Sequence, residues 1–95
     1  MKAKRFQLTA EVRTANRPDV RAGLQALLPD GQIEDTALGF KVHAQLEGES
    51  AEALNRTLLS AMHRIARRTT LRTEWKSDSA RERFFDYVQM SNLPT

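Results

Sequence analysis

Alternating polar and mostly apolar residues mark three extended segments of the chain. The pattern runs from Phe6 to Val12, from Phe40 to Leu46 and from Leu71 to Trp75. A period of two is typical of a strand with one buried and one exposed face. We therefore predict strands over 5–13, 40–47 and 71–76. A further short strand is predicted over Ile33–Thr36, followed by a turn at Ala37–Gly39.

Two other segments have the spacing of helices. The first begins at Pro18, which suits the first helical turn, and ends at Pro29-Asp30-Gly31. Its apolar stripe comprises Val20, Leu24, Leu27 and Leu28. The second covers 50–67 and begins at Ser50, a favoured N-cap residue. Its apolar stripe comprises Leu54, Leu58, Ala61, Met62 and Ile65, widened by Leu59 and Ala66. Both stripes are wide enough to cover one face of a sheet.

The predicted order is strand, helix, strand, strand, helix, strand. Such a chain closes into an α+β, ferredoxin-like βαββαβ sandwich, with a four-stranded antiparallel sheet in the order 4-1-3-2 and both helices on one face. We assign this domain to residues 1–78. Its predicted core is Phe6, Leu8, Val12, Leu24, Leu28, Phe40, Val42, Leu46, Leu54, Leu58, Met62, Ile65, Leu71 and Trp75. Because this fold hosts enzymes, regulators and RNA binders alike, it does not indicate a function.

Residues 79–95 form a separate aromatic segment after the predicted core. Ser79 and Glu82 have the spacing of a capping box, and Ala80, Phe84, Tyr87 and Val88 would share one face of a helix. A strand through 84–88 is the alternative. Exposed aromatic rings are unfavourable in water, so the segment should pack on its own sheet, pack on a second chain or bind another protein as a peptide. We predict a homodimer, with Phe84, Phe85, Tyr87 and Val88 as the self-association residues.

Composition narrows the possible classes of protein. The 95-residue chain suits one domain, and its lack of cysteine excludes disulfides and thiolate metal sites. No apolar stretch resembles a signal peptide or a membrane span, so we expect a cytoplasmic protein without a membrane partner. No motif indicates a cofactor.

The charges are distributed in blocks along the chain. Residues 30–52 carry six acidic and one basic side chain, whereas residues 53–76 carry six basic and one acidic. A candidate phosphate-binding set lies in the basic block and comprises Arg56, His63, Arg64, Arg67, Arg68 and Arg72. The alternative is a solvated helix face, because cations near a helix C-terminus are favourable. If the set binds nucleic acid, affinity should fall steeply with salt.

The polar face of the predicted sheet has a different composition. Its residues from the four strands include no aromatic side chain. Recognition of RNA by stacking bases on a sheet requires such side chains, so we expect that mode to be absent.

Catalytic signals are weak. His43 and His63 should lie on opposite sides of the sheet, and the acidic pairs Glu34-Asp35 and Glu47-x-Glu49 lie at strand ends, where carboxylates are normally solvated. No set combines a nucleophile, a base and an orienting group. We therefore interpret the chain as a non-enzymatic interaction module that self-associates. Two alternatives remain: nucleic-acid binding through the arginine-rich helix, and a small dimeric α+β-barrel enzyme with His43 or His63 as its proton carrier.

Overall fold

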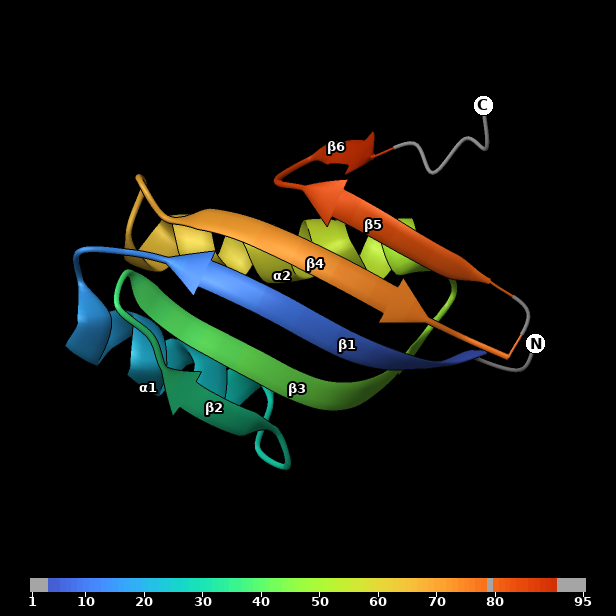
Figure 1. Cartoon of the computed structure of the whole chain (residues 1–95), viewed down its shortest axis with the longest axis horizontal. Helices are drawn as coiled ribbons and strands as arrows, with labels where there is room; N and C mark the ends of the chain where they lie inside the picture. Colours follow the sequence, from blue (N-terminus) through green and yellow to red (C-terminus); the bar gives the residue numbers. More distant parts are fainter. Residues whose placement is uncertain (1–3, 79, 91–95) are drawn as a thin grey trace.

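The chain folds into two helices and one six-stranded antiparallel sheet, as a computed structural model shows for residues 4–78 and 80–90 (Figure 1). The elements are β1 (Lys4–Arg13), α1 (Arg17–Leu27), β2 (Gln32–Asp35), β3 (Gly39–Gly48), α2 (Ala51–Ile65), β4 (Thr70–Lys76), β5 (Arg81–Phe85) and β6 (Val88–Met90). The sheet order is β2-β3-β1-β4-β5-β6. The first four strands therefore have the predicted order.

Strand β1 lies at the centre of the sheet and pairs with β3 on one side and β4 on the other. Val12 lies opposite Phe40 in β3 and Leu71 in β4. At the end of the β1–β3 pair, a Cβ atom on Gly39 would lie 1.9 Å from the carbonyl oxygen of Val12. Only a residue without a side chain permits this close approach between the two strands.

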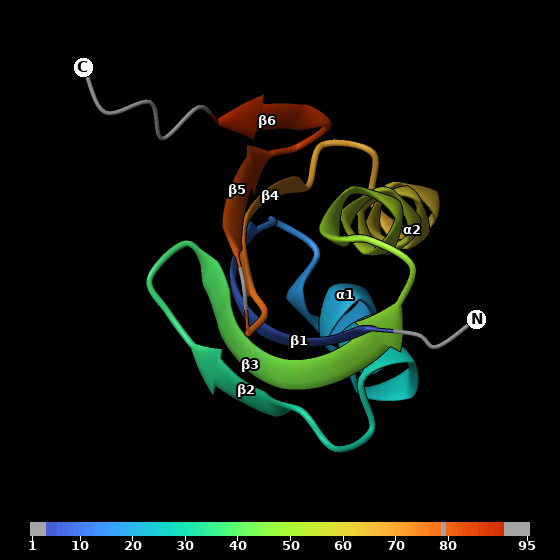
Figure 2. The same ribbon diagram turned by 90° about the vertical axis from the view of Figure 1, so that its right-hand side faces the viewer.

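Both helices cover the same face of the sheet, which curves around them (Figure 2). Helix α2 begins where predicted, because the Ser50 hydroxyl accepts a hydrogen bond of 3.1 Å from the backbone N–H of Ala53. The helices contact each other where Gly23 of α1 meets Ile65 of α2; a Cβ atom at Gly23 would lie 2.2 Å from Ile65 Cδ1. No helix in the described ranges is long and apolar enough to cross a membrane.

The core lies between the helices and the inner face of the sheet. Its buried apolar residues are Phe6, Leu8, Ala10, Val12, Val20, Leu24, Leu28, Phe40, Val42, Ala51, Leu58, Leu59, Met62, Leu71, Trp75 and Phe84. The predicted core residues Leu46, Leu54 and Ile65 pack against this cluster but are only partly buried. Phe84 contradicts the expectation that the core is complete before residue 79.

The structure corrects one prediction for the C-terminal region and decides between two alternatives. The sheet has six strands rather than four, and residues 81–90 form two strands of a hairpin, which is the alternative to the helix. Ser79 of the expected capping box lies outside the described residues, and Glu82 lies in β5. A strand forms because β4 offers an open edge and because alternation buries Phe84 while Arg83 and Phe85 remain exposed. A helix could not form hydrogen bonds with the unpaired backbone N–H and C=O groups along that edge.

Candidate functional site

The C-terminal hairpin, residues 81–90, is fixed to the sheet at its turn. Asp86 and Tyr87 connect β5 to β6, and Asp86 has a φ of 53°, a conformation that Asp tolerates better than most residues. Its backbone N–H donates to the Leu71 carbonyl oxygen at 2.8 Å. Its carboxylate oxygen Oδ1 accepts from the Leu71 N–H, also at 2.8 Å. Asp86 thus extends the pairing with β4 beyond the end of β5.

Asn55 of α2 connects the turn to the core. This side chain is 2% exposed, and its amide nitrogen donates to the Asp86 carbonyl oxygen at 2.8 Å. Its amide oxygen accepts from the Thr73 hydroxyl and from the Trp75 indole N–H. One buried amide therefore links α2, β4 and the hairpin turn. Satisfied polar groups of this kind specify one arrangement of the elements around them.

Tyr87 rests on the surface of α2. Its hydroxyl lies 3.3 Å from the Ser60 hydroxyl, and its ring contacts the His63 ring edge-on, with centroids 6.0 Å apart. His63 Nε2 lies 3.0 Å from the carbonyl oxygen of Thr69, which can only accept, so Nε2 carries the proton in this contact. His63 therefore supports the turn and is not directed into an open site.

The two faces of the hairpin differ in their exposure. Phe84 is buried against the core at 2% exposure, whereas Phe85, Val88 and Met90 lie on the outer face at 39%, 67% and 44%. Tyr87 in the turn is 54% exposed. Of the six large apolar residues exposed in the described part of the chain, these four belong to the hairpin, with three on its outer face and Tyr87 in the turn against α2. An apolar cluster at one place on a surface is typical of an interaction site.

We call Phe85, Tyr87, Val88 and Met90 the hairpin patch. It lies at an end of the sheet, because β6 is the outermost strand among residues 4–78 and 80–90 (Figures 1 and 2). Strand β6 has the sequence Val-Gln-Met, without a charge. Natural proteins usually protect an open edge with charged residues, so an uncharged edge can accept another strand.

The patch continues into a row of alternating charges on the outer face of the sheet. Glu34, Lys41, Glu11 and Arg72 lie side by side on β2, β3, β1 and β4, and Phe85 comes next on β5. The Arg72 guanidinium lies 5.2 Å from the centre of the Phe85 ring. The hairpin therefore adds an aromatic residue to the outer face, whose four predicted strands carry none.

The predicted phosphate-binding set does not lie on one surface. Arg56 pairs with Glu52 of the same helix at 3.2 Å, and Arg64, Arg67 and Arg68 are exposed around the end of α2. Arg72 lies on the outer face of the sheet, whereas α2 covers the inner face. Helix spacing predicted Arg56, Arg64 and Arg67 as neighbours, with Arg68 in the connection that follows, but strand alternation separates Arg72 from them.

Of the four predicted self-association residues, Phe85, Tyr87 and Val88 are exposed in the hairpin patch, whereas Phe84 is buried in its own chain and cannot contact a partner. Met90 and Asn55 were not predicted. The sequence could have indicated a role for Asn55, because this polar residue lies on the buried stripe of α2 between Ala51 and Leu58. A polar residue in such a stripe needs hydrogen-bond partners.

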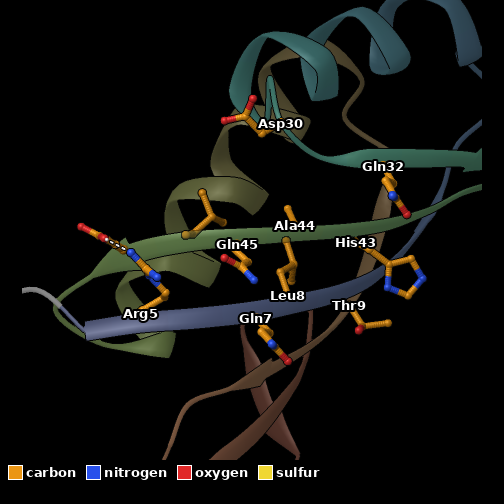
Figure 3. A pocket seen from close by; sticks show the side chains of 11 residues that line it. Arg5, Gln7, Leu8, Thr9, Asp30, Gln32, His43, Ala44 and Gln45 are labelled. Atoms are coloured by element: carbon orange, nitrogen blue, oxygen red, sulfur yellow. Dashed lines mark hydrogen bonds and ion pairs between the residues drawn. The ribbon is translucent and has the colours of Figure 1, made fainter.

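An open hollow of about 680 Å³ lies on β1 and β3 near the end of β2. Figure 3 shows Arg5, Gln7, Thr9, His43 and Gln45 spread along the two strands instead of meeting at one point. Two acidic residues line the hollow: Glu47, which forms an exposed ion pair with Arg5 at 3.3 Å, and Asp30, which lies just before β2. Within 4–78 and 80–90, no cluster of three or more His, Asp or Glu side chains could hold a metal ion.

No known protein family, curated protein or solved structure showed significant similarity to this chain.

Proposed function

We propose that this protein is an interaction module that self-associates through its C-terminal hairpin. The observation that carries the proposal is the hairpin patch beside the uncharged open edge of β6. A second copy could cover this apolar surface with an identical surface, as in a two-fold dimer. This surface supports the proposed function, because it offers an uncharged strand edge to a second copy.

The rigid support of the patch favours this function. Asn55, Asp86 and Tyr87 fix the turn before any partner binds. A surface that is already ordered loses little conformational freedom on association, which improves affinity. The buried polar residues Asn55 and Thr73 serve this support and do not face an open cavity.

We also propose that residues 4–76 are a ferredoxin-like βαββαβ sandwich to which the hairpin has been added. The order β2-β3-β1-β4, with both helices on one face, supports this assignment. In such a sandwich β4 would be an edge strand. The hairpin covers that edge and moves the open edge to β6.

Light scattering of the purified full chain tests the function. We expect twice the mass of one chain, and we expect Val88→Ser combined with Met90→Ser to give a folded monomer. The matched control is Leu27→Ser with Leu38→Ser, which changes two apolar residues that are 39% and 58% exposed elsewhere on the surface. The control should remain dimeric. A wild-type monomer at the highest soluble concentration would contradict the proposal.

A further inference from the structure

The backbone of the hairpin determines which residue of β6 can bond to a new strand. The Asp86 N–H is directed to β4, where it bonds to Leu71. Along a strand, successive residues direct their backbone groups to opposite sides. Phe85 therefore directs its N–H and C=O towards β6, where its partner is Val88.

The same alternation continues along β6. Val88 and Met90 direct their backbone groups to β5, opposite Phe85 and Arg83. Gln89, between them, directs its N–H and C=O away from β5 and towards the open edge. Gln89 is thus the β6 residue whose donor and acceptor pair has no strand partner within the described part of the chain.

We infer that two copies join by antiparallel pairing of β6 with β6 of the second copy, with the two-fold axis beside Gln89. The inference rests on the proposed self-association and specifies its geometry. In this register Gln89 lies opposite itself, and the two residues exchange both backbone hydrogen bonds. Val88 lies opposite Met90 of the second copy. The two six-stranded sheets become one continuous sheet.

The side chains agree with this register. Val88 and Met90 are both on the outer face and exposed, so the pairing brings together two apolar side chains from different copies beside Phe85. Gln89 lies on the opposite face, where its amide donates to Glu82 at 3.1 Å, and two facing glutamines carry no like charges. The β2 edge differs, because Glu34 and Asp35 would meet the same acidic residues in a second β2.

Cysteine crosslinking tests the register directly, because the natural chain contains no cysteine. Gln89→Cys should form an intermolecular disulfide quickly under mild oxidation. Its two Cα atoms would be about 5.5 Å apart in a hydrogen-bonded pair, within the disulfide range of about 4.4–6.8 Å. Val88→Cys should react slowly, because its counterpart in the other copy lies two positions out of register. Glu34→Cys on β2 is the control for random collision.

Non-reducing gels of the three variants, read with light scattering, separate the outcomes. Faster crosslinking of Gln89→Cys than of Val88→Cys and Glu34→Cys supports the register. Equal or faster crosslinking of Val88→Cys overturns it. If the protein is a dimer but Gln89→Cys reacts no faster than Glu34→Cys, edge pairing is wrong and self-association stands. If the protein is a monomer, both proposals fail.

Discussion

The sheet ends in two short strands, β2 and β6, that are held in different ways. Strand β2 carries Glu34 and Asp35, and arginines of α1 hold it: Arg17 donates to the Thr36 and Ala37 carbonyl oxygens at 2.7 and 2.8 Å, and Arg21 pairs with Asp35. These contacts are exposed. Strand β6 carries no charge, and its hairpin is held by the buried residues Phe84 and Asn55.

The difference shows that the contacts that fix a strand in the sheet and the charges that prevent a new strand from pairing with it are independent. Besides its pairing with β3, strand β2 is held to α1 by weak exposed contacts, but its charges discourage a new partner. Strand β6 belongs to a hairpin with strong buried contacts, but its edge carries no charge that would discourage a new partner. Substitutions that weaken the two ends should therefore differ in size, with the larger effects at the hairpin.

The largest effect is expected from Phe84→Ala. It removes a ring that is 2% exposed and leaves a cavity between β5 and the core. We expect a loss of about 3 kcal/mol in the free energy of unfolding, measured by urea denaturation. Phe85→Ala is the matched control and should lose under about 1 kcal/mol, because that ring is 39% exposed. Equal losses would show that the hairpin does not complete the core.

Asn55→Ala should have the next largest effect. It leaves the Trp75 N–H, the Thr73 hydroxyl and the Asp86 carbonyl oxygen without their partner. We expect a loss of about 2 kcal/mol in the same measurement, because unsatisfied buried polar groups are unfavourable. Thr57→Ala, on the exposed side of α2, should change stability by no more than about 0.5 kcal/mol.

Asp86→Ala should have a smaller effect, confined to the turn. The variant loses the carboxylate that accepts from the Leu71 N–H and places alanine at a φ of 53°. We expect a loss of about 1.5 kcal/mol, with faster amide hydrogen exchange at Leu71. Asp86→Asn should lose less, because asparagine tolerates this φ and keeps an acceptor oxygen. Identical behaviour of the two variants would argue against a special role for this turn.

The smallest effect is expected at the other end of the sheet, from Arg21→Ala. The Arg21–Asp35 pair is exposed, with 42% and 67% of the side chains accessible. Exposed ion pairs contribute little, so stability should change by no more than about 0.5 kcal/mol in urea denaturation. A loss as large as that of Asn55→Ala would mean that the two ends are held equally strongly.

The sequence predicted the elements whose patterns are unambiguous. Alternation identified β1, β3 and β4, and Ser50 identified the start of α2. It left helix and strand open at 81–90, where Phe84 and Phe85 are adjacent and Ala80, Phe84, Tyr87 and Val88 also fit a helical face. The deciding factor was the open edge of β4, a tertiary feature that no local pattern contains. For the same reason the position of Phe85 on the outer face beside Arg72 was not predicted.

The central position of β1 has a consequence for the rate of folding. This strand precedes every other described element in the chain, yet its register requires Gln7 to meet Gln45 in β3 and Lys76 in β4. Both pairings join residues that are far apart in the sequence, so each requires the closure of a long loop. Chains dominated by such non-local contacts fold slowly. Until they close, the apolar side of β1 is accessible to other chains, so dilute refolding should give a higher yield than concentrated refolding.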